Sequence, residues 1–356
     1  MKEEKRKLVK IGISIGDIAG IGLEVIIKAL NDNRILQKIT PIVYGDTQLA
    51  RYYRKGINIH DFSFNPIHSV EQSNPKRVNI VNVDNEKIEL VFGKSSKETG
   101  ALALKSLELA TSDLAANKID ALVTAPIDKN TIQSEGFNFP GHTEYLTQMA
   151  NVDDALMLMI EDQLRVGVVT GHVPLKDVAS EISVPLILRK LELLNQSLIN
   201  DFEVVKPKIA VLALNPHAGD GGLIGEEEIS IISPAIEEAN ELGILTFGPF
   251  SADGFFGNGN YQNFDAILAM YHDQGLIPFK TLAYTGGVNY TAGLPIVRTS
   301  PAHGTAYDIA GKGIADESSF RAAVFTAYDI FQTRKKIREW TADPLQKTNS
   351  REVGRV

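Results

Sequence analysis

The chain has 356 residues, which is long enough for two lobes. Its composition, 44% hydrophobic and 22% charged, is typical of a soluble globular protein. It has 36 Lys and Arg against 44 Asp and Glu, and its net charge of −8 argues against a nucleic-acid partner. Cysteine is absent, so disulfides and thiolate-bound zinc are excluded. The charged N-terminus and the lack of a long apolar run argue against secretion and membrane insertion, and we expect a cytoplasmic enzyme.

Apolar runs of strand length alternate with segments of helical period along the chain. The predicted strands are 8–14, 41–45, 77–83, 120–127, 164–172, 208–217 and 266–273, and the predicted helices are 100–118, 185–199, 226–242 and 318–340. This alternation predicts an α/β fold with a mostly parallel sheet. Because no linker divides the chain, we expect one catalytic unit with discontinuous lobes over residues 1–340, followed by a polar tail, 341–356.

Three histidines end predicted strands, namely His172, His217 and His272. The carboxyl ends of parallel strands lie on one edge of a sheet, where ligands bind, so we expect the three imidazoles to converge there. Three neutral histidines with open coordination positions would form a catalytic site for a divalent metal. The alternative is that each histidine only caps its strand and bonds to backbone.

Two further groups of residues suit a phosphorylated ligand. Lys280, Asn289 and Arg298 combine a point charge, a neutral donor and a bidentate fork, and the glycines between them suggest a hairpin that brings them together. His142 and Thr143 follow a Pro-Gly turn at an expected helix start. This pair either caps the helix or contacts a ligand.

Two glycine-rich stretches lie at opposite ends of the chain. The first, 14–24, opens a helix but lacks the Lys-Ser/Thr of a P-loop, so close packing of strand and helix is the favoured interpretation over phosphate binding. The second, 302–316, has three glycines and a histidine, which predicts a loop that a ligand approaches closely. No G-x-G-x-x-G fingerprint opens a helix, so a nucleotide here would bind without a Rossmann turn.

Eight segments resemble, in chain order, the signature segments of the 4-hydroxythreonine-4-phosphate dehydrogenase family of pyridoxal phosphate biosynthesis: GDIAGIGLE, TAPIDK, GHTEYL, TGHVPL, LNPHAGDGGLIGEEE, GPFSADGFF, YHDQGLIPFK and GLPIVRTSPAHGTAYDIAGKG. The match runs from residue 12 to about 330. HGTAYDIAGKGIAD is also similar to the adenine-binding loop of isocitrate and isopropylmalate dehydrogenases, with Asp316 where that group usually has asparagine. The resemblance implies their fold, in which two lobes flank a central cleft.

The resemblance also implies an activity and a set of site residues. It implies oxidation of 4-phosphohydroxy-L-threonine by NAD and decarboxylation to 3-amino-2-oxopropyl phosphate, assisted by one divalent metal (Zn, Mg or Co). The implied metal ligands are the three strand-end histidines. The implied substrate contacts are His142, Thr143, Lys280, Asn289 and Arg298, and the implied NAD contacts are His303, Gly304 and Asp316.

A homodimer with a shared active site follows from the same resemblance. On that basis we expect His272 and the phosphate-contacting residues to come from different chains. Asp253 and Asp273 are both candidates for the general base, and the sequence does not choose between them. The alternative functions are a related 4-phospho-D-threonate or D-erythronate dehydrogenase and, further off, a phosphate acyltransferase or a metal-binding protein without catalysis.

Overall fold

The computed structural model describes residues 8–83, 88–133, 137, 139, 141–284 and 286–342. Within this part of the chain the strands form one 12-stranded sheet in the order β3-β4-β2-β1-β5-β12-β11-β6-β7-β10-β8-β9. The strands are β1 (Val9–Ser14), β2 (Ile39–Gly45), β3 (Asn65–Ile67), β4 (Asn79–Asn82), β5 (Ala121–Thr124), β6 (Leu156–Glu161), β7 (Leu164–Thr170), β8 (Lys208–Leu212), β9 (Leu245–Phe250), β10 (Ala266–Tyr271), β11 (Val288–Ala292) and β12 (Arg298–Pro301). The helices are α1 (Gly22–Leu30), α2 (Thr47–Gly56), α3 (Lys97–Ala115), α4 (Lys129–Gln133), α5 (His142–Met149), α6 (Val178–Glu181), α7 (Val184–Phe202), α8 (Ser233–Glu241), α9 (Ala252–Gly257), α10 (His272–Leu282) and α11 (Ser318–Thr341).

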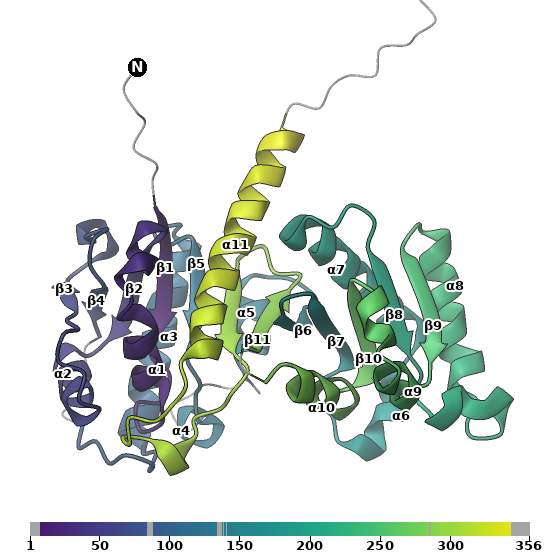
Figure 1. Ribbon diagram of the computed structural model, residues 1–356, viewed down its shortest axis with the longest axis horizontal. Helices are drawn as coiled ribbons and strands as arrows, with labels where there is room; N and C mark the ends of the chain where they lie inside the picture. Colours follow the sequence, from purple (N-terminus) through teal and green to yellow (C-terminus); the bar gives the residue numbers. More distant parts are fainter. Residues whose placement is uncertain are drawn as a thin grey trace, which may run out of the picture.

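The sheet consists of two parallel halves joined by an antiparallel centre. Strands β3, β4, β2, β1, β5 and β12 run parallel in one half, and β7, β10, β8 and β9 run parallel in the other. Between them β11 is antiparallel to β12 and β6, and β6 is antiparallel to β7. The chain enters the second half after β5 and returns through β11 and β12, so the predicted α/β fold with a mostly parallel sheet is confirmed (Figure 1).

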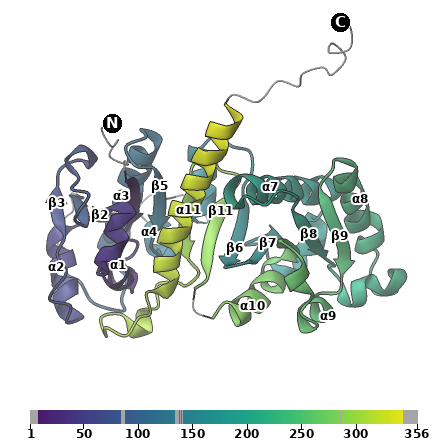
Figure 2. The same cartoon turned by 45° about the horizontal axis from the view of Figure 1, so that its top comes forward.

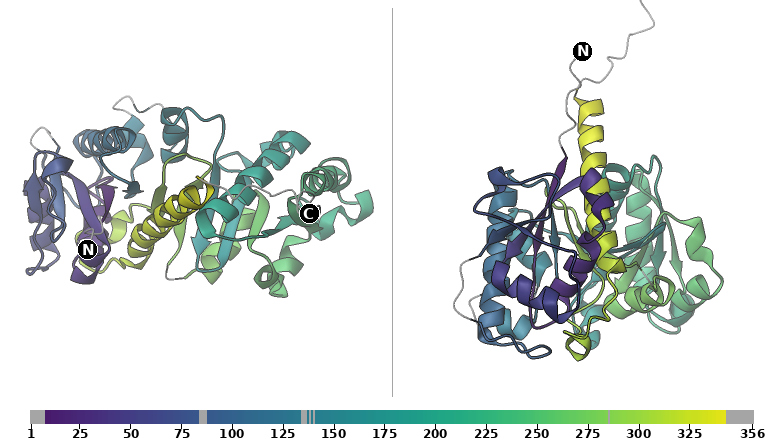
Figure 3. Two further views of the ribbon diagram at one scale, coloured as in Figure 1. Left: turned by 90° about the horizontal axis from the view of Figure 1, so that it is seen from above. Right: turned by 60° about the vertical axis from the view of Figure 1, so that its left-hand side comes forward.

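Helices cover both sides of the sheet, which explains why several strands are apolar throughout. The view from above in Figure 3 shows this arrangement, and every residue of β2 and β5 is buried. The long helix α11 crosses the middle of the molecule and packs against β12 and β5 (Figure 2). Helix α11 therefore packs across both β12, at which the chain returns, and β5 of the N-terminal half of the sheet.

The predicted strands and helices are all present, although their bounds differ by a few residues, while strands β3, β6, β9, β11 and β12 were not predicted. Most of the predicted strands are shorter than expected, whereas β2, α7 and α11 are longer. The predicted helix 226–242 is interrupted, because a π-helical turn, Glu228–Ile232, precedes α8. The predicted tail, 341–356, lies beyond the described residues except for its first two positions. No helix in the described part of the chain has the length and apolar character needed to span a membrane.

Candidate active site

A cavity of about 300 Å³ lies where the centre of the sheet meets α5 and α10. All five predicted substrate contacts line it, together with two of the three strand-end histidines and the start of the second glycine-rich loop. The lining includes Thr124, His142, Thr143, Glu144, His172, His272, Lys280, Asn289, Arg298, Ser300, His303 and Gly304. Sequence segments more than 150 residues apart thus meet in one chamber.

Arg298, the first residue of β12, is a buried cation in this cavity. Its Nε and Nη2 donate to Thr124 Oγ1 at 3.1 and 2.6 Å, and its Nη1 donates to Thr291 Oγ1 at 3.2 Å. Burial lowers the pKa of the guanidinium to about 10, and the charge of Glu144 opposes that shift. A buried cation hydrogen-bonded to neutral hydroxyls is stabilised by an anion in the adjoining space.

Four residues that line this cavity each have a buried polar atom without a hydrogen-bond partner in the described part of the chain. These atoms are His142 Nε2, Glu144 Oε2, Asn289 Oδ1 and His303 Nε2. Buried polar groups in folded proteins are nearly always paired, so such a cluster indicates a site for a polar ligand. Burial, with smaller effects of Arg298 and Lys129, holds the pKa of His142 well below its usual range, so its imidazole is neutral at physiological pH.

The local fold explains how these residues meet. Strands β11 and β12 form the predicted hairpin, and their register pairs Asn289 with Ser300. Lys280 comes from α10, which packs against β7 and β10. Helix α5 begins at His142 with Gly141 as its N-cap, and no side chain caps it, so the predicted capping role of His142 or Thr143 is wrong. Both side chains are left to face the cavity.

His172 and His272 lie side by side at the carboxyl ends of β7 and β10, with ring centroids 6.0 Å apart. The Nδ1 of His272 is 2.7 Å from Asp273 Oδ1, and the Nδ1 of His172 is 3.8 Å from Glu144 Oε1. A carboxylate on Nδ1 fixes the ring and its tautomer and leaves Nε2 for another partner. Asp273 is therefore engaged as the hydrogen-bond partner of a histidine.

His217 follows β8, the parallel neighbour of β10, and so lies on the same edge of the sheet as predicted. It does not line the cavity, however, and its side chain is exposed. Every residue from 217 to 222 has a positive φ, including the non-glycine residues His217, Ala218 and Asp220. In the described part of the chain no three His, Asp or Glu side chains are grouped closely enough to hold a metal. The predicted convergence of three imidazoles is not found within one chain.

The structure also corrects the predicted division of the site between subunits. His272 lines the same cavity of one chain as Lys280 and Arg298, so the prediction that they come from different chains is wrong. The reason is topological, because α10, which begins at His272, leads directly into β11 and the hairpin. Of the three histidines, only His217 lies outside the cavity that contains Lys280 and Arg298.

The remaining predicted residues fall into two places. Asp253 lies outside the cavity, near His217, and its Oδ1 accepts a hydrogen bond from Ser251 Oγ at 2.6 Å. Asp316 also lies outside the cavity, at the end of the second glycine-rich loop, where it accepts a hydrogen bond from the Ser318 N–H at 2.7 Å. Hydrogen bonding by the Ser318 side chain and by its N–H, with Arg321 and Lys28 nearby, lowers the pKa of Asp316, which is therefore ionised at neutral pH.

Sequence reasoning did not single out Glu144, Thr124 or Thr291. Glu144 stands two residues after His142 in the segment GHTEYL, so its proximity to the site was readable once that segment was placed on a helix. The two threonines that hold Arg298 carry no such signal. Each is a small polar residue inside an apolar strand, and only the register of β5, β12 and β11 brings them together.

Fold and site together define an α/β protein with a cavity lined by the cations Arg298 and Lys280 at the centre of its sheet. An isocitrate dehydrogenase from Methylococcus capsulatus has the same fold, at a TM-score of 0.50 and 14% identity over 93% of this chain and 89% of that one. Residues 37–327 match the family described as pyridoxal phosphate biosynthetic protein PdxA. The chain belongs to this family.

Its relatives carry two names. A 4-hydroxythreonine-4-phosphate dehydrogenase of Bacteroides thetaiotaomicron is 49% identical over 98% of this chain and 94% of that protein. A crystal structure of a 4-hydroxythreonine-4-phosphate dehydrogenase from Burkholderia phymatum superposes with a TM-score of 0.75 at 35% identity, covering 91% of this chain and 99% of that one. A protein of Oceanobacillus iheyensis, provisionally named D-threonate 4-phosphate dehydrogenase, is 39% identical over 91% of this chain and 98% of its own length.

Proposed function

We propose that this chain oxidises 4-phosphohydroxy-L-threonine with NAD and decarboxylates the product to 3-amino-2-oxopropyl phosphate, as a cytoplasmic step towards pyridoxine 5′-phosphate. The observation that carries the proposal is Arg298, a buried guanidinium bonded only to neutral hydroxyls within the described chain, beside Lys280 in the same cavity. A phosphate monoester supplies the negative charge that this pair of cations requires. The names of the relatives give the rest of the substrate.

Four residues of the cavity have defined tasks in this reaction. Arg298 and Lys280 bind the phosphate, and Asn289 and the neutral His142 offer hydrogen bonds that orient it. A nicotinamide bound here would supply a hydride acceptor for C3, and a divalent cation (Zn, Mg or Co) would supply Lewis-acid stabilisation of negative charge on the C3 oxygen. The hydroxyl proton goes to a base in the cleft, and a proton returns to C2 after decarboxylation.

The metal requires a second copy of the chain. The paired imidazoles of His172 and His272 fit a divalent cation, but they are one ligand short of a three-histidine catalytic site. His217 is exposed at the same sheet edge, in a turn that presents it to the outside. A homodimer in which the partner's His217 completes the pair accounts for both observations, and Asp253 would enter the shared site with it.

For the cofactor, we propose that NAD lies along the loop that begins at His303. Gly304 borders open space and His303 Nε2 is buried without a partner, so both can meet a ligand. Asp316, ionised at the far end of this loop, would repel the 2′-phosphate of NADP. We therefore expect a preference for NAD over NADP.

A 4-phospho-D-threonate or D-erythronate dehydrogenase is the second candidate, because one relative carries the first of these names. The residues for phosphate and metal serve either substrate equally. Initial rates of NADH formation with each phosphorylated acid, with and without added Zn, Mg or Co, separate the two. We expect the highest kcat/KM for 4-phosphohydroxy-L-threonine. A higher value for either sugar acid would favour the second candidate, and no NADH with any of them would reject both.

A further inference from the structure

We propose that Glu24 and Lys28 on α1 are positioning residues for the dinucleotide, because they hold in place the loop His303–Asp316 that leads from the cavity. Neither side chain lines the cavity. Both instead bond to backbone at the far end of the loop. This inference rests on the proposed binding of NAD along that loop, and it assigns the first glycine-rich stretch and α1 a role in cofactor affinity.

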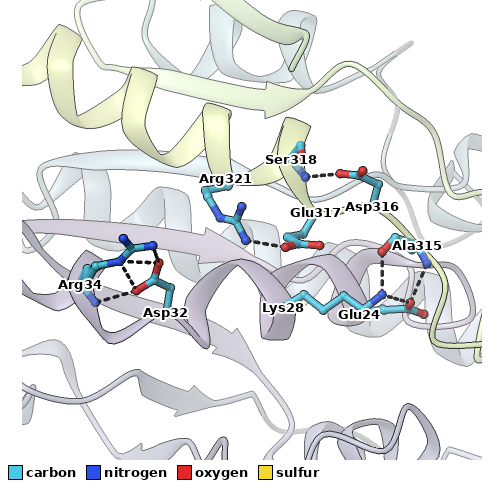
Figure 4. A network of polar contacts seen from close by, with 9 residues as sticks. All are labelled: Glu24, Lys28, Asp32, Arg34, Ala315, Asp316, Glu317, Ser318 and Arg321. Atoms are coloured by element: carbon cyan, nitrogen blue, oxygen red, sulfur yellow. Dashed lines mark hydrogen bonds and ion pairs between the residues drawn. The ribbon is translucent and has the colours of Figure 1, made fainter. Parts of the chain in front are cut away.

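Glu24 and Lys28 bond to each other and to the backbone of the loop (Figure 4). Lys28 Nζ donates to Glu24 Oε1 at 2.8 Å and to the Ala315 carbonyl at 2.7 Å. It also donates to the Gly313 carbonyl at 3.0 Å, a contact that is not drawn in Figure 4. Glu24 Oε1 also accepts from the Ala315 N–H at 2.8 Å. The three protons of the ammonium are thereby all used, two of them on the loop's own backbone.

Because the Glu24 carboxylate is buried, it is destabilising unless the loop supplies its hydrogen-bond donor. The Glu24 side chain is fully buried, and its Oε2 has no hydrogen-bond partner in the described part of the chain. Lys28 is the one cation bonded to it there. A buried carboxylate is stable only when paired and hydrogen-bonded, so the Ala315 N–H and the Lys28 ammonium are required together. Displacing the loop would leave the carboxylate short of a donor.

The near end of the loop is fastened to the turn before α1. The Ile21 N–H donates to the Thr305 carbonyl at 2.9 Å, and the Tyr307 hydroxyl donates to Asp17 Oδ2 at 2.9 Å. A Cβ on Gly20 would lie 2.5 Å from the Thr305 carbonyl oxygen, so only glycine allows this approach. The predicted packing role of the turn is thus correct, but part of its packing partner is the ligand-facing loop.

The contacts of Glu24 and Lys28 lie on one side of the cleft only. Arg298 and Lys280 belong to β12 and α10, and no hydrogen bond in the described chain joins either of them to Glu24 or Lys28. Loosening the loop should therefore weaken the dinucleotide and spare the phosphorylated substrate. A purely structural role would instead lower stability and affect both ligands together.

The test is Lys28→Met, which keeps the length of the stem and removes the three donors. Losing the hydrogen bonds of a charged group should raise the KM for NAD about tenfold, with kcat and the KM for the phosphorylated acid nearly unchanged. Lys28→Arg should recover most of the affinity. Hydrogen–deuterium exchange without ligand should show faster exchange in peptides from 303–316, and at the Ala315 amide in particular.

The matched control is Arg34→Met. Arg34 lies just after α1 and pairs with Asp32 through its Nη2 at 2.6 Å, but its side chain is 86% exposed and does not touch the loop (Figure 4). We expect no change in the KM for NAD or in loop exchange. The second variant is Glu24→Gln, which is nearly isosteric and can place its NH₂ at the unpartnered Oε2 position. It removes the ion pair while retaining an oxygen for Ala315, so we expect a smaller rise in the same KM.

The outcomes separate this inference from the proposed function. If the wild-type chain forms no NADH, the proposed function fails, and the positioning role fails with it even where loop exchange changes. If the wild type is active and Lys28→Met leaves the KM for NAD unchanged, the positioning role is wrong while the function stands. An equal rise of both KM values together with a lower Tm would also overturn it, because that pattern indicates general loss of structure.

Discussion

The residues around Arg298 and the turn that carries His217 differ in how they are assembled and in how exposed they are. The anion pocket, defined here as His142, Thr143, Lys280, Asn289 and Arg298, is assembled from four segments of one chain. The His217 turn, residues 217–222, is exposed at its histidine, and all of its residues have positive φ.

This difference indicates which part of the site one chain can complete. The anion pocket is formed within one chain around the buried guanidinium of Arg298. The His217 turn uses a backbone conformation that costs non-glycine residues about 1–2 kcal/mol each. It is nevertheless held firmly, since the buried Glu228 accepts from the Asn215 N–H at 2.7 Å and from Asn215 Nδ2 at 3.0 Å. A strained and anchored turn that presents a histidine outward suits contact with a second chain.

The largest expected effect comes from removing His217. His217→Ala should lose bound metal and turnover while the anion pocket still binds inorganic phosphate, because the two regions share no residue. Metal content of the purified protein and phosphate titration by calorimetry measure the two separately. Full metal content in the variant would remove His217 from the site.

Mixing variants tests whether His217 acts across the dimer. His217→Ala and Arg298→Ala chains should each be inactive alone. If the two residues of one site come from opposite chains, random pairing gives one intact site in half of the dimers and restores up to about a quarter of wild-type activity. The control pair is His272→Ala with Arg298→Ala, which share one cavity in one chain, and it should restore none. Recovery in the control pair would contradict the geometry described here.

Arg298→Lys tests the anion pocket and should have the next largest effect. Lysine keeps the charge but cannot donate to Thr124 and Thr291 while also presenting a fork to phosphate. The KM for the phosphorylated acid should rise by roughly tenfold or more, as expected for the loss of a charge-assisted hydrogen bond. Initial-rate kinetics at saturating NAD give the value, with the dephosphorylated acid as reference. If wild-type enzyme turned over both acids equally well, phosphate recognition by this pocket would be excluded.

The same comparison explains which parts of the fold and of the site could be predicted from the sequence. The α/β fold was predictable, because the alternation of buried strands and helices is a local pattern in the chain. The five residues of the anion pocket were chosen by residue type and by family resemblance, and the structure places all five around one cavity. The proximity of His172 and His272 was part of the predicted convergence, and it follows from the parallel pairing of β7 with β10. The separation of His217 from both was not predictable, because it depends on the positive-φ turn after β8. That turn has no periodicity that sequence analysis can detect.

Gly219→Ala probes the conformation of the His217 turn. At φ 76°, the new Cβ would lie 2.6 Å from Glu228 Oε2, so the substitution adds a clash to the backbone strain. Gly221→Ala is the matched control, since its φ of 65° imposes similar strain while nothing lies within 4 Å of its Cβ. Gly221→Ala should lose about 1–2 kcal/mol of stability through backbone strain, and Gly219→Ala should lose more because of the added clash. Only Gly219→Ala should also bind metal more weakly, which isothermal titration with Zn²⁺ would show. Equal metal affinities for the two variants would mean that the Glu228 contact does not position His217.

The smallest expected effect is a pH dependence that distinguishes the anion pocket from the rest of the chain. Burial, with Arg298 and Lys129 nearby, holds the pKa of His142 well below 6.5 in the folded protein. Below pH 6.5 the unfolded chain therefore binds a proton at this position that the folded chain does not, and the free energy of unfolding falls as pH decreases, by at most about 1.4 kcal/mol per pH unit from this group. The contribution is fully present above pH 6.5. His142→Gln should unfold with a shallower dependence on pH between 6.5 and 5 in urea titrations, whereas His60→Gln, at an exposed position, should keep the wild-type slope. If the His142→Gln slope matched that of the wild type, the imidazole would have to be charged in the folded state, and the pocket would carry one more positive charge than its burial allows.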